Sequence, residues 1–224
     1  MLVARRTVRC GPSLAWMDRV RRRPPRPVAT TREVQWLLRR CGWPIAIDGI
    51  KGPRTRRALR DFKRGYAFRP SFRRYGPRVG PFTTRRLRRS ARLGGRASAH
   101  FWFVEFASLT RGDCKGNGWI EVKKELARGL ERYRRLAGRP VPIVSGFRDP
   151  GKNQCVGGAS NSQHLYGNAA DIPPVMALQR VRSLRVFSGI GVLRATGRVR
   201  HVDVRHVRPN PTRGTPRNPT IWFY

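Results

Sequence analysis

The stretch SQHLYGNAAD, residues 162–171, decides how the rest of this chain is interpreted. It places an imidazole, His164, and a carboxylate, Asp171, on either side of small residues that let the backbone pass close to a bound group. Later in the chain, residues 199–204 (VRHVDV) are typical of a β-strand. Because side chains alternate along a strand, His201 and Asp203 share one face of it. Two imidazoles and a carboxylate are the ligands of catalytic zinc sites that keep a fourth position open for water.

Histidines and acids are scarce in this chain, so their clustering is informative. The 224 residues include four His and 12 Asp or Glu, and two residues of each kind fall in these two segments. A lone His is most often a surface or core residue, and Asp171 before Ile172 and Pro173 could instead cap a turn. The concentration favours a metal site over these alternatives.

The same residues form a longer pattern. The motif SxHxxGxAxD over residues 162–171 is preceded by SGFR at residues 145–148 and followed by HVDVR at residues 201–205. This pattern resembles the zinc D-Ala-D-Ala carboxypeptidases and related peptidoglycan peptidases of the M15 group, and it is far more specific than a short glycine-rich motif. The resemblance covers residues 99–224. It implies a small α+β zinc peptidase, with a central and mainly antiparallel sheet, that uses one Zn²⁺ ion on cell-wall stem peptides.

The resemblance also implies a set of metal ligands: His164, Asp171 and His201. Proton transfer to and from the attacking water needs a further group, and Asp203 is the nearest candidate because it shares the face of His201. Several relatives carry an acid three residues before the last ligand, where this chain has Arg198. Ligation by Asp203 or His206 therefore stays open, although His206 falls on the opposite face if the strand continues.

Three further residues are candidates for contact with substrate. Arg148 stands where the family places an arginine that holds the substrate's carboxylate or stabilises the oxyanion, a role that its planar fork suits. The alternative for Arg148 is a surface ion pair with Asp149 or with another acid. Ser162 and Gln163 are expected to bind substrate or to support His164.

The chain is strongly basic. It has 49 Lys and Arg, 43 of them Arg, against 12 acidic residues, for a net charge of +37. Such a surface predicts a polyanionic partner. No RNP-like aromatic motif, zinc-finger spacing or heptad basic region is present, so nucleic acid is disfavoured. We expect peptidoglycan, together with anionic envelope polymers, as the partner; an Arg-rich genome acting on a tolerant surface is the alternative explanation.

The first half of the sequence predicts a separate helical domain. Residues 1–29 form a basic, Pro/Arg-rich arm, and residues 30–92 predict three helices. A capping box at Thr30 and Glu33 opens the first helix, Pro53 opens the second, and the third covers about 83–90. The segments VQWLL, DGIKGPRT and ALRDF, at residues 34–38, 48–55 and 58–62, resemble the three-helix peptidoglycan-binding domain of wall hydrolases. An insertion at 66–78 departs from that compact form.

Residues 93–98 (LGGRAS) are expected to be the linker to the second domain, residues 99–224. In that domain the apolar spacing predicts a helix over 119–136, stopped by Gly138, and a second helix over 175–185. Strands are predicted at 141–144, 190–193 and 199–204, with a polar active-site loop at 149–161. The terminal aromatic residues, 221–224, are expected in the core or in a cleft wall.

Four cysteines, Cys10, Cys41, Cys114 and Cys155, form no C-x-x-C pair, which argues against a cysteine-based metal or redox site. An even number suits two disulfides in an oxidising compartment. Cys114 and Cys155, both near the site, are the pair that the family resemblance favours over two buried free thiols. No apolar run approaches a membrane span, and the run at residues 14–17 is short for a signal peptide.

These observations predict a monomeric zinc peptidase that is secreted, periplasmic or associated with the cell wall. Either a leader has been lost or misannotated, or export uses another route, such as phage-lysin release. Carboxypeptidase and endopeptidase activity differ in whether Arg148 meets a free carboxylate. The rival hypothesis is a non-catalytic protein that binds cell wall or polyanions on a peptidase-like scaffold.

Overall fold

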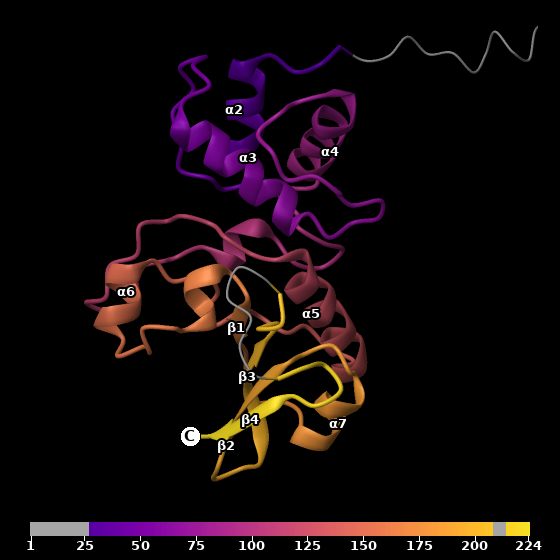
Figure 1. Ribbon diagram of the computed structural model, residues 1–224, viewed down its shortest axis with the longest axis vertical. Coiled ribbons are helices and arrows are strands. Elements are labelled where there is room, and N and C mark those ends of the chain that lie inside the picture. Colours follow the sequence, from indigo (N-terminus) through magenta and orange to yellow (C-terminus); the bar gives the residue numbers. More distant parts are fainter. Residues whose placement is uncertain (1–26, 208–213) are drawn as a thin grey trace, which may run out of the picture.

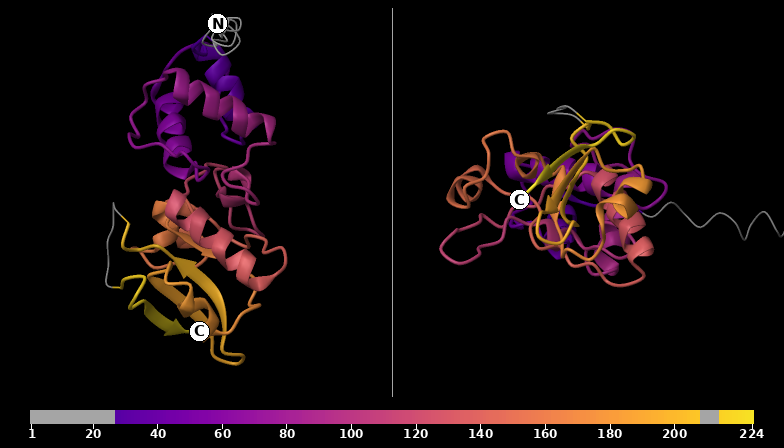
Figure 2. Two further views of the ribbon diagram at one scale, coloured as in Figure 1. Left: turned by 90° about the vertical axis from the view of Figure 1, so that its right-hand side faces the viewer. Right: turned by 90° about the horizontal axis from the view of Figure 1, so that it is seen from below.

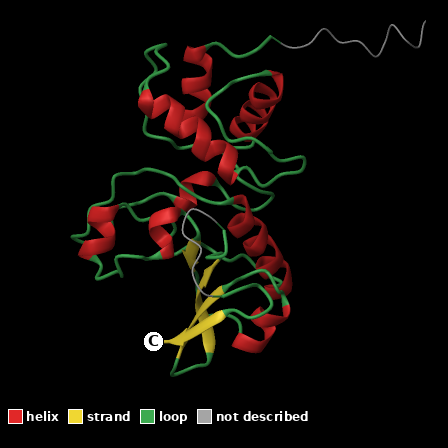
Figure 3. Ribbon diagram, in the orientation of Figure 1, coloured by secondary structure: helices red, strands yellow, loops and turns green. Residues whose placement is uncertain are grey.

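A computed structural model describes residues 27–207 and 214–224. It has an α+β architecture in which three helices form one end and a small sheet with further helices forms the other (Figure 1, Figure 3). Most of the expected arm, including Cys10, lies outside the described residues. Among the residues that are described, no helix is both long and apolar enough to cross a membrane.

The three expected helices of the first unit are present: α2 (Thr31–Arg40), α3 (Pro53–Gly65) and α4 (Pro81–Arg92). The hydroxyl of Thr30 caps α2 by accepting a hydrogen bond from the amide of Glu33 at 3.2 Å. The Glu33 carboxylate does not complete the capping box, because it accepts from Arg88 of α4 at 2.7 and 3.0 Å. This ion pair joins the first and third helices. Ala29, predicted to belong to the arm, is buried, and its amide donates to Thr84 at 3.1 Å.

The insertion at 66–78 is folded onto α3. Tyr66 and Phe72 are buried, and their rings pack with Phe62 at centroid distances of 5.5 and 6.0 Å. The ammonium group of Lys63 donates to the carbonyl of Gly76 at 2.7 Å. These contacts hold the insertion against α3. Helix α4, which follows the insertion, is longer than the predicted 83–90.

The second unit contains a four-stranded sheet in the order β1-β3-β2-β4. The strands are β1 (Ala169–Asp171), β2 (Gly189–Leu193), β3 (Arg198–Asp203) and β4 (Thr220–Phe223). The pairs β1–β3 and β2–β3 are antiparallel and β2–β4 is parallel, so the expected mainly antiparallel sheet is confirmed. Helices α5 (Lys124–Ala137) and α7 (Leu178–Ser183) lie on one side of the sheet, and α6 (Pro150–Cys155) lies on the other (Figure 1, Figure 2).

Several predicted bounds in this unit were wrong. The helix predicted over 119–136 begins only at Lys124, because the preceding residues are extended: Ile120 bridges Ala107, and the Lys123 amide donates to Gly167 at 2.9 Å. The strand predicted at 141–144 is reduced to one bridge between Ser145 and Asp171. The loop predicted at 149–161 contains α6, and α7 is shorter than the predicted 175–185.

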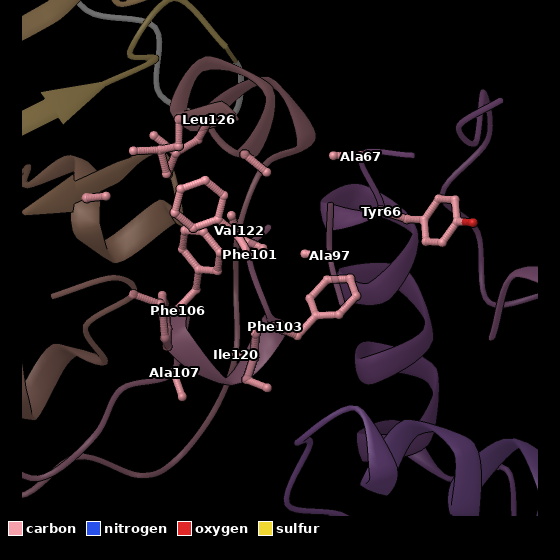
Figure 4. Packing of buried hydrophobic residues seen from close by; sticks show 14 of the residues in the cluster. Tyr66, Ala67, Ala97, Phe101, Phe103, Phe106, Ala107, Ile120, Val122 and Leu126 are labelled. Atoms are coloured by element: carbon pink, nitrogen blue, oxygen red, sulfur yellow. The ribbon is translucent and has the colours of Figure 1, made fainter. Parts of the chain in front are cut away.

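The two units share one hydrophobic core (Figure 4). Phe103, in the short 3-10 helix η1 (Phe103–Phe106), packs against Trp43 and Phe62 of the first unit at centroid distances of 4.8 and 5.5 Å. The segment 93–98, expected to be a linker, is folded into this junction. Ala97 is fully buried, and its carbonyl accepts from the amide of Ala67 at 2.8 Å. The chain therefore passes from one unit to the other through packed structure.

A buried polar cluster crosses the same junction. The carboxylate of Asp61 in α3 is 2% exposed and accepts a hydrogen bond from the Trp119 indole at 3.0 Å. Arg57 and Arg64 lie 3.6 and 3.5 Å from Asp61, and both also approach Glu121. Burial, together with the negative charge of Glu121, raises the pKa of Asp61 to about 6 against these hydrogen bonds and cations.

Replacing Phe103 with Ala is expected to destabilise both units together. The substitution empties a fully buried site in the shared core and is expected to cost about 3–5 kcal/mol of unfolding free energy. The matched Phe82→Ala change, at a side chain that is 63% exposed, is expected to cost no more than about 1 kcal/mol. Calorimetry checks this: one cooperative transition should shift downward for Phe103→Ala, whereas two separate transitions with only one shifted would contradict a shared core.

Asp61 is expected to make stability depend on pH. Its pKa of about 6 in the folded protein lies above the ordinary value of 3.8, so its contribution to stability is fully present below about pH 4 and is lost as pH rises through about 6. Asp61→Asn keeps an acceptor for Trp119 without the charge. The variant should exceed the wild type by roughly 2–3 kcal/mol at pH 7 and match it near pH 4. Denaturant titrations at both pH values measure this, and a constant difference would refute the assignment.

Candidate metal centre

The loop that carries His164 is shaped by local hydrogen bonds and by the close packing of Gly167 against the Glu121 backbone. His164 lies in the short 3-10 helix η2 (Gln163–Tyr166), where the Ser162 hydroxyl accepts from the His164 amide at 3.4 Å. Gly167 ends this turn with φ of +64°, and a Cβ there would lie 2.6 Å from the Glu121 backbone. Only glycine meets both demands. Strand β1 follows at once and ends on Asp171.

Strand pairing brings the third residue to the same point. In the β1–β3 ladder Asp171 is the partner of His201, so both side chains occur at one level of the sheet. The Oδ1 atom of Asp171 lies 2.9 Å from Nδ1 of His201 and 3.3 Å from Nε2 of His164. The two imidazole nitrogens are 3.2 Å apart. The three residues expected to bind zinc thus meet at one point.

These three distances fit a tetrahedral metal. Ligand atoms at about 2.0–2.1 Å from a tetrahedral zinc ion lie roughly 3.3 Å from one another, and the three edges measured here are 2.9, 3.2 and 3.3 Å. The three atoms therefore form one face of a coordination tetrahedron.

In each imidazole, the ring nitrogen that does not face Asp171 has a hydrogen-bond partner of its own. Nδ1 of His164 lies 2.6 Å from the Gly146 carbonyl, which can only accept, so this nitrogen carries the proton. Nε2 of His201 lies 3.3 Å from the Asp203 carboxylate and is the donor on that side. Both inward nitrogens then present lone pairs toward a third acceptor, Asp171. Three acceptors that converge in a buried place are satisfied by a positive charge between them, which can be a proton held by His201 toward Asp171 or a metal ion.

The electrostatics of the cluster agree with this requirement. Burial works to raise the pKa of Asp171, but the adjacent His164 and His201 rings outweigh it and hold that pKa well below its usual range. Burial lowers the pKa of His164, whereas the bonds from His201 to Asp171 and Asp203 outweigh burial and raise the pKa of His201. The site therefore keeps an ionised carboxylate at neutral pH and attracts positive charge.

Arg148 is part of this site. Its guanidinium donates to Oδ2 of Asp171 and, through Nε, to the Ser145 hydroxyl at 3.1 Å. The alternative pairing with Asp149 is wrong, because Asp149 caps α6 and accepts from the amide of Lys152 at 3.2 Å. Arg148 also lines the cavity over the metal-binding cluster, so one side chain steadies Asp171 and faces the solvent space above it.

The other predicted residues take different places. Gln163 is buried and accepts from Asn168 at 2.9 Å, while both Gln163 and Ser162 reach the cavity wall. Asp203 is fully buried and is gripped by Arg205, whose Nη2 lies 2.7 Å from Oδ2. His206 is exposed and bonds to the Ser188 hydroxyl at 2.8 Å. Within the described part of the chain, neither Asp203 nor His206 joins the metal-binding cluster.

A cavity of about 480 Å³ opens over the cluster. Its wall includes the terminal aromatics Trp222 and Tyr224, and the Trp222 ring lies 4.9 Å from the His201 ring. The expectation that these aromatics form a cleft wall is confirmed. Sequence reasoning missed the Gly146 carbonyl and Arg205 as supports of the two imidazoles; the spacing of Arg205 two residues after Asp203 was the available signal.

Residues 156–159 and 161 also line the cavity. This segment follows Cys155, which forms the expected disulfide with Cys114. The bridge ties α6 to the loop around residue 114 and so fixes the start of the wall. Cys41 is a buried free thiol that lies 3.5 Å from the Ser90 hydroxyl, and its expected partner for a second bridge, Cys10, is outside the described residues.

Comparison with known proteins agrees with the geometry. Residues 99–207 match the family model of Peptidase M15. The chain is also similar to the zinc D-Ala-D-Ala carboxypeptidase of Streptomyces albus G, with 30% identity over 153 residues. That match covers 62% of this chain and 56% of the relative, so this chain spans little more than half of the relative's length. The family match does not include residues 30–92.

Asp203→Asn tests whether Asp203 orients His201 or transfers protons. If it orients the ring, the variant should bind zinc roughly 10–100-fold more weakly, and excess zinc should restore turnover. If it transfers protons, zinc affinity should be unchanged and kcat should fall by about 10²–10⁴ at saturating zinc. Zinc titration with a chelating competitor, followed by kinetics at saturating metal, separates the two; wild-type values in both assays would exclude either role.

Proposed function

We propose that this chain, whose residues 99–207 form a domain of the peptidase M15 type, hydrolyses peptide bonds in the stem peptides of peptidoglycan with one zinc ion. The observation that carries the proposal is the convergence of three acceptor atoms, from His164, Asp171 and His201, at the floor of a cavity. Zinc bound there supplies a water whose pKa is lowered to near ~7 and polarises the scissile carbonyl.

The chain's own residues then bind and orient the peptide. Arg148 lies beside Asp171 at the cavity wall, where its remaining donors can reach either a terminal carboxylate or the oxygen that becomes negative during attack. Trp222 and Tyr224 provide an apolar wall against which a peptide side chain can lie. Together these groups fix the substrate across the three acceptor atoms.

Asp203 is the second acid of the cavity. Among the described residues that line it, the acids are Asp171 and Asp203, which supports Asp203 as the group that moves protons. Its contacts also suit a positioning role, because Arg205 holds its carboxylate and His201 lies 3.3 Å away. Arg198, at the position where several relatives carry an acid, is exposed on β3.

The carboxypeptidase reaction is favoured over endopeptidase cleavage. A relative similar to this chain is named for removal of terminal D-Ala, and Arg148 offers the bidentate partner that a free terminal carboxylate needs. We further propose that the helical unit, residues 30–92, docks on peptidoglycan or on anionic envelope polymers. It belongs to the half of the chain before Ala99, which carries 28 basic and 4 acidic residues. The disulfide between Cys114 and Cys155 suits a secreted or cell-wall location.

The alternative is a non-catalytic wall-binding protein that keeps the peptidase fold as a scaffold. Arg198 in place of an acid favours this alternative. The geometry of the cluster disfavours it, because a binding scaffold has no need for three buried acceptors directed at one point.

Digestion of purified peptidoglycan by wild type and His164→Ala tests the proposal. The wild type should bind one zinc per chain and release peptide or D-Ala, whereas His164→Ala should lose zinc and nearly all product. His206→Ala is the matched control, because His206 is exposed and outside the cluster; it should retain both. Equal product from wild type and His164→Ala would reject the zinc mechanism, and zinc binding without product would support the scaffold alternative.

A further inference from the structure

Arg200 reaches the cavity because of an irregularity in the sheet. In the β2–β3 ladder Gly191 pairs with His201, yet the next residue, Val192, pairs with Val199. Arg200 is thus an extra residue in β3 with no partner on β2. A β-bulge of this kind turns a side chain away from the face that strict alternation assigns to it. Arg200 and His201, although adjacent in sequence, both line the cavity.

Arg200 differs from the other arginines of the cavity because its side chain has no hydrogen-bond or ion-pair partner among the described residues. Arg148 is paired with Asp171, and Arg205 is paired with Asp203 and stacks 5.0 Å from the Trp222 ring. The Arg200 side chain is exposed and makes no hydrogen bond or ion pair with any residue in the described ranges. Both acids of the cavity are therefore already neutralised, and Arg200 adds an unpaired positive charge.

The residues that line the cavity with Arg200 show where its guanidinium group lies. Arg200 lines the same cavity as Asp171, Arg148 and Tyr224. A free guanidinium at such a place presents a fork that matches a carboxylate in two parallel hydrogen bonds.

We propose that Arg200 is a specificity-determining residue that selects peptides with a free side-chain carboxylate on a residue flanking the scissile bond. This inference rests on the proposed peptidase function and adds to it the charge of the substrate. Arg148 contacts the terminal carboxylate or the oxyanion at the scissile bond, whereas Arg200 binds the side-chain carboxylate of a flanking residue. Peptides in which that carboxylate is replaced by a carboxamide are bound more weakly.

The test uses two pairs of synthetic peptides with the zinc-loaded full chain. Each pair differs only by Glu or Gln, placed before the scissile bond in one pair and after it in the other. The wild type should show a kcat/KM roughly tenfold higher for the Glu peptide of one pair, a preference that weakens at high salt. Arg200→Gln should abolish this preference by lowering kcat/KM for the Glu peptide to about that of the Gln peptide.

Arg198→Gln is the matched control, because Arg198 is an exposed arginine on the same strand that does not line the cavity. It should keep the wild-type preference. An unchanged preference in Arg200→Gln, or no preference in the wild type for either pair, would overturn the inference. If the wild type cleaves none of the peptides, the proposed function fails, and equilibrium binding of the same pairs decides the inference: discrimination lost only in Arg200→Gln supports it, and equal or absent binding overturns it.

Discussion

The pairing of β1 with β3 is the constraint on which the site depends. Asp171 is at once a strand residue opposite His201, the acceptor for Arg148, and the bridge partner of Ser145. A slip of one residue in this ladder would turn His201 to the other face of the sheet and remove it from Asp171. The positions of Asp171 and His201 relative to each other are therefore set by the register of the two strands.

The support for this register extends into the helical unit. The Gly167 carbonyl accepts from Lys123, and Glu121 lies against Gly167 where a Cβ would not fit. The same extended segment carries Trp119, which donates to Asp61 of α3. The loop at residues 162–171 therefore packs against the extended segment at 119–123, which in turn contacts the first unit. This continuity explains why the core runs through both units without a break.

The sequence was most informative where one residue type meets a local demand. Short-range signals in the sequence included the cap of α2 at Thr30, the start of α3 at Pro53, and the end of α5 at Gly138, which has a positive φ. The three residues expected to bind zinc meet as the family motif implied. The sequence was least informative where tertiary contacts override local pattern. Ile120 and Val122 are spaced by two, as in a strand, but they run directly into the apolar series of α5, and the prediction of one helix over 119–136 did not separate the two.

Two features had no short-range signal. The extra residue in β3 depends on how β2 pairs with it, and the packing of residues 93–98 depends on surfaces contributed by both units. Glycine, serine and arginine in that segment are typical of a mobile connection, yet Ala97 is fully buried.

That packed connection has a mechanical consequence. An enzyme whose binding domain is joined by a flexible linker can reach many bonds of the wall from one point of attachment. Here Phe103 wedged against Trp43 and Phe62 fixes the angle between the two units. Under the proposed docking role of the helical unit, the cavity would reach only those bonds that lie at one fixed distance from the docked unit, and other bonds would be reached only after the unit dissociates and binds again.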